Sequence, residues 1–342
     1  MSESTTLFLN KYLRALVLVV LVLQTSLTVL FLRYSRTNNK EEQFIPTTVV
    51  FMTECLKYCL CLLLLLISRH GSLRSSVRMF REEILMRPRE TVVLAVPAVM
   101  YTLQNNLLII ALTNLDAATY QVTYQLKILT TAGFSVILLK KQLNTRQWLA
   151  LVLLMIGVAL VQLEEESPSE DSTEQHQNNR LLGFTAVLVA CFSSGYAGVY
   201  YEKLVKMSCQ PSLVIRNLQL GLFSLMFSCA AMLYYSSADI SANGLFYGYT
   251  PPVLTIIILQ SIGGLVVAAT IKFTDNILKG FATSISIIVS TLCSCFILQD
   301  LTPGPYFLLG SSIVMSASVL YGLPLSELCG CSGQNKSALL PL

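Results

Sequence analysis

Two lysines, Lys127 and Lys279, stand inside long apolar stretches of the sequence. Asp275, four residues before Lys279, is the one carboxylate at helical spacing from either of them. An ionisable side chain at membrane depth costs at least about 2.5–3.5 kcal/mol, so each lysine needs a compensating partner. Phosphate fits this role because lysine binds it as a point charge. We therefore expect a mobile, phosphate-bearing anion to be the missing partner.

Polar side chains accompany both lysines along the chain. Helical spacing of i, i+4, i+7 and i+11 predicts two polar faces, Tyr120–Tyr124–Lys127–Thr131 and Lys279–Thr283–Ser286–Ser290. Two more polar groups are Tyr101, Gln104, Asn105 and Asn106, and Arg216, Asn217 and Gln219. Hydroxyls and amides also hold helices together, and this is our preferred interpretation of any single Ser or Thr. We favour a role in lining a polar cavity for Tyr120, Asn105, Asn217 and the two lysines. In such a cavity a tyrosine ring can stack on an aromatic base of the ligand.

Two other features inside apolar stretches have structural interpretations. Glu54 and Lys57 are three residues apart and can pair along one helix, although lining a pathway is the alternative. Gly263 and Gly264 favour close helix contact over ligand approach.

The composition requires that these residues sit in a membrane. The chain has 342 residues, of which 54% are hydrophobic and 12% are charged, whereas soluble proteins carry about 25% charged residues. This excludes a soluble enzyme, a nucleic-acid binder and a disordered chain. The net charge of +4 is too small to indicate a polyanionic partner.

No enzyme motif appears in the sequence. It contains no HExxH, GxSxG or glycine-rich phosphate loop, and its histidines, His70 and His176, fall between apolar stretches. We therefore expect no catalytic residues, no metal and no cofactor. Most of the ten cysteines are expected to behave as small hydrophobic residues.

We predict an all-α polytopic membrane protein with ten transmembrane helices, because a span needs about 20 apolar residues. Pro97 falls inside the third span and should kink it. The predicted spans are 9–32, 45–67, 91–112, 115–139 and 146–163 in the first half, and 181–201, 211–235, 251–271, 276–298 and 303–323 in the second.

The lysines and arginines predict the orientation. With the N-terminus in the cytosol, most of the 23 Lys and Arg fall on the cytosolic side, and the exceptions between spans are Arg33, Arg36, Lys40 and Arg180. The positive-inside rule then places both termini in the cytosol. The acidic segment 164–180 becomes a flexible luminal linker, and residues 325–342 form a cytosolic tail in which Cys329 and Cys331 are candidates for palmitoylation.

The two halves share a short motif. Residues 126–131 and 278–283 both read Leu-Lys-x-x-x-Thr, and both lie in the penultimate span of a five-span half. Because five is odd, residues 1–163 and 181–324 would form two inverted five-helix repeats. Inverted repeats are common in secondary transporters, whose substrate site lies near the membrane midplane between the halves.

The same segments resemble a known family. Residues 101–106, 115–131, 194–203, 216–219 and 274–283 are similar to the nucleotide-sugar transporters of the drug/metabolite transporter superfamily, and the resemblance runs from about residue 7 to 324. The nearest branch is that of UDP-N-acetylglucosamine and UDP-galactose transporters, because residues 128–131 read Ile-Leu-Thr-Thr.

The resemblance implies a multi-pass Golgi antiporter that exchanges cytosolic UDP-sugar for luminal UMP, with the ER membrane as the alternative location. By the same resemblance, Lys127 and Lys279 hold phosphate, Tyr120 and Asn217 contact the nucleotide, and Tyr101 and Asn105 line the cavity near the base or sugar. Gln104, Tyr124, Thr131 and Thr283 complete the expected substrate site. Tyr196 and Tyr201 stand where many relatives have Phe, which adds two hydroxyls.

Two rival interpretations remain at this point. The alternatives to a UDP-sugar antiporter are a carrier of another nucleotide sugar or phosphorylated metabolite, and a non-transporting scaffold that holds glycosyltransferases. The expected partners are UDP-sugar, UMP and membrane lipid, with a homodimer or a glycosyltransferase association as further hypotheses. Unpaired lysines argue against a scaffold, which has no need of them.

Overall fold

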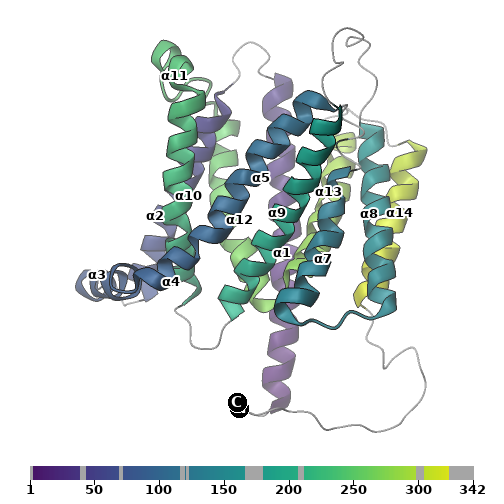
Figure 1. Ribbon diagram of the computed structural model, residues 1–342, viewed down its shortest axis with the longest axis horizontal. Helices are drawn as coiled ribbons and strands as arrows, with labels where there is room; N and C mark the ends of the chain where they lie inside the picture. The colour runs from purple at the N-terminus through teal and green to yellow at the C-terminus, as the bar shows by residue number, and fades with distance from the viewer. Residues whose placement is uncertain are drawn as a thin grey trace.

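The computed structural model describes residues 3–38, 44–68, 72–115, 120, 123–165, 180–206, 212–297 and 304–322. All regular elements of these residues are helices (Figure 1). The linker residues 166–179, the tail with Cys329 and Cys331, and both histidines lie outside the described residues.

Within the described residues, ten longer helices form the body of the protein. They are α1 (Glu3–Asn38), α2 (Pro46–Ser68), α5 (Ala95–Asn114), α7 (Leu126–Leu139), α8 (Thr145–Glu165), α9 (Arg180–Lys206), α10 (Leu213–Tyr235), α12 (Pro251–Phe273), α13 (Asn276–Ile297) and α14 (Pro305–Gly322). The short helical segments that the structure describes between them are α3 (Leu73–Phe80), the π-helical η1 (Arg81–Leu85), α4 (Pro88–Val93) and α11 (Ser237–Asn243).

Eight of the described helical stretches are long and apolar enough to cross a membrane, with mean hydropathies between 1.3 and 2.6. The prediction of an all-helical polytopic membrane protein is therefore confirmed. Two further apolar helices, Leu126–Leu139 and Pro305–Tyr321, are shorter. The first of these fills only the later part of the predicted span 115–139, so the count of ten spans stays a prediction.

Prolines set several helix boundaries. Pro46 begins α2 and Pro251 begins α12, since a missing N–H costs nothing in a first turn. The kink expected from Pro97 is confirmed, because the helix is interrupted at Leu94, between α4 and α5. A proline ring clashes with the carbonyl four residues earlier, here that of Val93.

The helices pair across the two halves of the sequence. The first helix of the first half, α1, packs against α12 and α13, and the first helix of the second half, α9, packs against α5 and α7. In the same way α2 packs against α10, and α8 packs against α14. If each helix is replaced by the helix at the same position in the other half, the same set of helix pairs results.

The α8–α14 contact brings two backbones together at glycines. A Cβ on Gly157 would lie 2.9 Å from the carbonyl oxygen of Gly310, and a Cβ on Gly310 would lie 2.7 Å from that of Gly157. Small residues of this kind allow close helix packing in membranes, where dispersion contacts replace the hydrophobic effect.

Gly157→Ala is expected to lower the thermal unfolding temperature of the detergent-purified protein by several degrees, because overpacking costs about 1–3 kcal/mol. Gly133→Ala is the matched control, since a Cβ there meets nothing within 4 Å. Alanine also favours helix by about 1 kcal/mol over glycine. Equal unfolding temperatures for the two variants would contradict the close-contact role of Gly157.

Candidate functional site

A cavity of about 460 Å³ lies among α1, α5, α7, α8, α9 and α13, so both halves of the chain contribute to its wall. Cavities of roughly 300–1,000 Å³ are typical of small-molecule sites. Its polar or charged lining residues are Thr25, Tyr101, Gln104, Tyr124, Gln125, Lys127, Thr131, Gln162, Ser194, Asn276, Lys279, Thr283 and Ser284.

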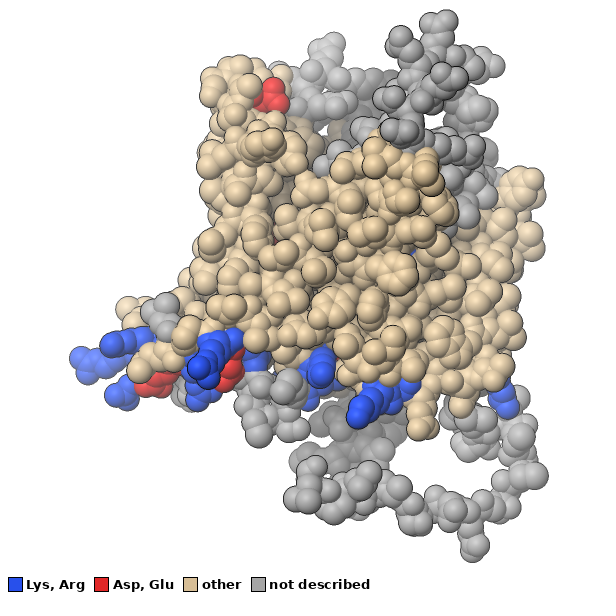
Figure 2. Space-filling model, viewed as in Figure 1, with Lys and Arg blue, Asp and Glu red and all other residues tan. Residues whose placement is uncertain are grey.

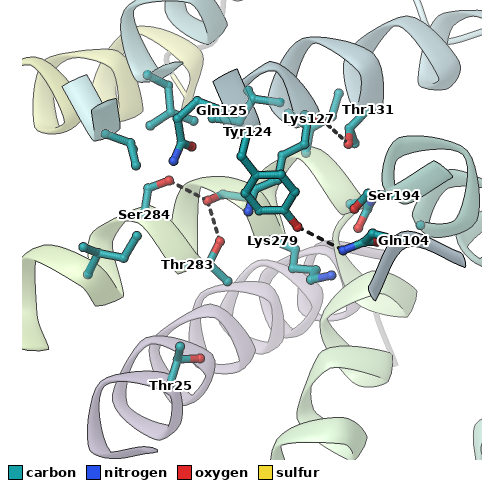
Figure 3. Close-up of a pocket in the computed structure, with 18 of the residues that line it drawn as sticks. Thr25, Gln104, Tyr124, Gln125, Lys127, Thr131, Ser194, Lys279, Thr283 and Ser284 are labelled. Atoms are coloured by element: carbon teal, nitrogen blue, oxygen red, sulfur yellow. Dashed lines mark hydrogen bonds between the residues drawn. The ribbon is translucent and has the colours of Figure 1, made fainter. Parts of the chain in front are cut away.

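Lys127 and Lys279 both line this cavity, one from α7 and the other from α13 (Figure 3). Within the described residues, no carboxylate lies within 4.0 Å of either ammonium group. Three other lysines form ion pairs: Lys57 with Glu54, Lys141 with Asp275, and Lys206 with Glu202. The described lining of the cavity thus holds two cations and no acidic residue, which suits an anionic ligand.

Asp275 does not neutralise Lys279, because it is already occupied. Its Oδ2 lies 2.5 Å from the Nζ of Lys141, and its Oδ1 accepts a 2.7 Å hydrogen bond from the backbone N–H of Leu278. The second bond is an N-cap for α13, which satisfies one of the free N–H groups of the first turn. Lys279 is therefore left facing the cavity.

Tyr124 positions Lys127 and is itself held by two neighbours. The Nζ of Lys127 lies 4.0 Å from the centroid of the Tyr124 ring, a cation–π contact worth up to about 2 kcal/mol when desolvated. Gln104 donates a 3.0 Å hydrogen bond to the Tyr124 hydroxyl. Tyr120 stacks on Tyr124 with ring centroids 5.8 Å apart. Figure 3 shows Gln104, Tyr124, Lys127 and Lys279 converging in the cavity.

Tyr101, Thr131 and Thr283 also line the cavity, as expected. The two threonine hydroxyls donate to their own helices, to the carbonyls of Lys127 at 2.7 Å and Gly280 at 2.8 Å. Their oxygens keep lone pairs that can accept a hydrogen bond from a ligand.

Three predicted residues are not among those that line this cavity. Tyr120 reaches it only through its stacking on Tyr124. Asn105 is exposed, one residue after the buried Gln104, because consecutive helical residues point about 100° apart. Asn217 is buried and donates a 3.1 Å hydrogen bond to the Leu213 carbonyl of its own helix.

The predicted polar face on α13 is only partly directed at the cavity. Lys279 and Thr283 of this face line the cavity, and so does the neighbouring Ser284. Ser286 and Ser290 are buried, and they donate hydrogen bonds to the carbonyls of Ala282 and Ile287 in their own helix. The hydroxyls of these two serines therefore bond within α13 and do not line the cavity.

Sequence reasoning missed a second polar wall. Gln125 donates a 2.5 Å hydrogen bond to Gln162 on α8, and both line the cavity together with Ser194 and Thr25. The available signal was an isolated amide in an apolar stretch, such as Gln162 in its predicted span.

The Glu54–Lys57 pair forms along α2, as predicted, and lies outside the described cavity lining. Gly263 abuts the side chain of Gln24 on α1, and Gly264 abuts that of Lys57. The prediction that these glycines permit close helix contact is therefore confirmed.

A comparison with protein-family models matches the nucleotide-sugar transporter family over residues 9–322, nearly the whole chain. The chain belongs to the nucleotide-sugar transporter family. The site lysines, Lys127 and Lys279, both fall within the matched region.

Relatives in this family carry specific names. The chain is 52% identical to the UDP-N-acetylglucosamine transporter of Canis lupus familiaris over 311 residues, which cover 91% of this chain and 95% of the relative. It is 52% identical to the human protein of the same name over 304 residues, covering 89% and 93%. It is 43% identical to the UDP-galactose translocator of Mus musculus over 324 residues, covering 95% and 82%.

The fold is also similar to that of a solved crystal structure, with a TM-score of 0.65 over 90% of this chain and 97% of the other. At 13% sequence identity, this likeness bears on the fold alone.

Proposed function

We propose that this nucleotide-sugar transporter is a Golgi antiporter that exchanges cytosolic UDP-sugar for luminal UMP by alternating access. The observation that carries the proposal is the pair of cavity lysines without a carboxylate partner among the described residues. A uridine nucleotide brings phosphate to these ammonium groups and a base that can stack on a tyrosine ring.

The sugar cargo is proposed from the relatives. The chain is more similar to proteins named UDP-N-acetylglucosamine transporter, at 50–52% identity, than to those named UDP-galactose translocator, at 42–44%. We therefore propose UDP-N-acetylglucosamine as the preferred cargo and UDP-galactose as the second.

Ten spans in two inverted repeats are part of the proposal. The helix pairings that persist on exchange of the two halves support it. The charge distribution supports the proposed orientation: Figure 2 shows Lys and Arg gathered along the lower end of the molecule, beneath a broad uncharged surface. Under the positive-inside rule this end faces the cytosol, and we propose that both termini are cytosolic.

Charge repulsion supplies the coupling between the two directions of transport. Without a bound phosphate, Lys127 and Lys279 repel each other in a cavity of low dielectric constant. The empty occluded state is therefore unfavourable, and the carrier returns more readily with UMP bound.

Liposomes containing the purified protein test this function. Labelled UDP-N-acetylglucosamine is expected to enter UMP-loaded liposomes at least tenfold faster than empty ones, because only the loaded carrier crosses readily. Liposomes loaded with uridine are the control, since uridine lacks the phosphate that the lysines require. Equal uptake into empty and UMP-loaded liposomes would contradict exchange, and no uptake of any labelled nucleotide sugar would favour the scaffold alternative.

A further inference from the structure

The short helix α3 leaves the helical bundle sideways. It lies at the lower left of Figure 1, at the foot of α2 and beside α4, and Figure 2 shows basic side chains there. Met79 and Phe80 fasten this segment to the protein, because they pack on a buried cluster that includes Leu65 of α2 and Ile215 of α10.

The remaining surface of α3 has two different sectors. Leu73 and Val77, one turn apart, are 69% and 60% exposed. The exposed arginines Arg74, Arg78 and Arg81 follow at i, i+4 and i+7, and so form a stripe next to this apolar sector. A helix with an apolar sector beside a basic stripe is typical of elements that lie in a membrane interface.

The apolar sector continues the lipid-facing surface of α2. That surface includes Leu63 and Leu64 and ends at Ile67, which is 63% exposed, six residues before Leu73. A soluble partner would have to cover apolar side chains at the level where the bilayer begins. The acyl chains of the membrane cover them without any further partner.

The basic stripe is only partly neutralised. Arg78 lies 3.6 Å from Glu82, an exposed pair worth little. Arg74 and Arg81 have no carboxylate partner within the part of the chain that the structure describes. Their guanidinium groups are free to bind phosphate, which they can do through two parallel hydrogen bonds.

We propose that α3 and η1, Leu73–Leu85, form a docking site for the headgroups of anionic phospholipids in the cytosolic leaflet. The phosphates are bound by Arg74, Arg78 and Arg81. The acyl chains near the headgroups surround Leu73 and Val77. This proposal rests on the orientation given under the proposed function. It does not rest on nucleotide transport, because the lipid site shares no residue with the cavity lining. Clusters of basic residues directly beside a membrane span attract anionic lipid at about 1 kcal/mol per residue.

The test is the binding of a fluorescently labelled phosphatidylinositol 4-phosphate to the purified full-length protein, measured by anisotropy in neutral detergent micelles. Arg74→Gln/Arg81→Gln is expected to weaken binding about thirty-fold, the equivalent of about 2 kcal/mol for two basic residues. High salt should weaken wild-type binding in the same direction. The thermal unfolding temperature of each variant checks that it is folded.

Lys203→Gln/Lys272→Gln is the matched control. It removes two exposed cations from the same end of the molecule, and neither has an ion-pair partner within the described region. The proposal requires the control to keep wild-type affinity. A similar loss of affinity in both double variants would show that overall charge alone causes the effect, and this would overturn the proposal.

A third variant separates a membrane-docked helix from a simple phosphate site. Leu73→Gln/Val77→Gln keeps every arginine, so it is expected to bind the lipid at least fivefold more weakly but to bind soluble inositol 1,4-bisphosphate as wild type does. Unchanged lipid binding would show that the apolar sector does not insert. If wild-type protein fails to bind the lipid at all, the segment is not a lipid site, and a protein partner becomes the interpretation of its exposed face.

Discussion

Lys127→Met and Lys279→Met are each expected to reduce UMP-coupled nucleotide-sugar exchange by about ten- to a hundredfold. Each substitution removes a cation that the cavity presents to the ligand, and a charge-assisted hydrogen bond is worth about 1.5–3 kcal/mol. Methionine is nearly as long as lysine, so the helix packing is preserved. Exchange into UMP-loaded liposomes measures the effect.

The same substitutions should raise the thermal unfolding temperature of the ligand-free protein. Two like charges without a carboxylate partner in the described cavity destabilise the empty protein, and an apolar side chain of similar volume removes that cost. A few degrees of stabilisation is expected, while the further rise caused by saturating UMP should vanish, because a ligand stabilises only the state that it binds. A purely structural lysine would show the opposite sign, with lower stability on substitution.

Lys203→Met is the matched control for this pair of measurements. Lys203 is an exposed lysine on α9, the helix that also lines the cavity, and it lies outside the cavity lining. Wild-type exchange and an unchanged UMP-induced stabilisation are expected. Retained exchange in Lys127→Met or Lys279→Met would remove the phosphate role of that lysine.

Much of the fold and the centre of the site follow from local sequence. Apolar runs longer than 20 residues specify helices, whose backbone groups are satisfied within the helix. Pro46, Pro97 and Pro251 each change only the helix that contains them, by starting or interrupting it. The scarcity of charge singles out Lys127 and Lys279, because a lone cation in an apolar stretch requires an explanation. Both do line one cavity.

The rest depends on contacts between distant segments. Lys141 and Asp275, 134 residues apart, form a pair that no local rule selects. Without knowledge of this pair, helical spacing assigns Asp275 to Lys279. Gln104, Asn105 and Asn106 are three adjacent amides that point in three directions, and only the packing of α5 against α9 decides which one reaches the cavity. The Gln125–Gln162 bond likewise requires α7 and α8 to be adjacent.

These distant contacts also converge on one end of the cavity. The N-terminus of α13 receives two carboxylates: Asp275, and Glu202 of α9, whose Oε2 accepts a 2.9 Å hydrogen bond from the Asn276 N–H. Lys206 joins the group through Glu202 Oε1 at 2.7 Å and the Thr274 carbonyl at 2.5 Å. Negative charge at a helix N-terminus is favourable because of the helix dipole. Since Asn276 itself lines the cavity, this cluster borders the cavity and holds the N-terminus of α13 in place there.

Glu202→Gln is therefore expected to favour the state that is open at this end. Glu202 is only 1% exposed, and bonds to a buried carboxylate contribute about 1.5–3 kcal/mol each. Their loss should lower the maximal exchange rate about tenfold and, in sealed vesicles with the cytosolic face outward, lower the KM for added UDP-sugar several-fold. Both effects follow because the binding-competent population rises while the closing step becomes less favourable.

The split between KM and maximal rate separates this gating role from damage to the fold. A merely structural loss reduces the amount of active protein, and so lowers the maximal rate at an unchanged KM. Glu82→Gln, which breaks the exposed Arg78–Glu82 pair, is the control and should change neither quantity in vesicles of neutral lipid. Lys141→Gln acts on the same helix end through Asp275, so its effect should be smaller and should not add to that of Glu202→Gln. An unchanged KM in Glu202→Gln would mean that the carboxylate cluster anchors α13 without controlling access to the cavity.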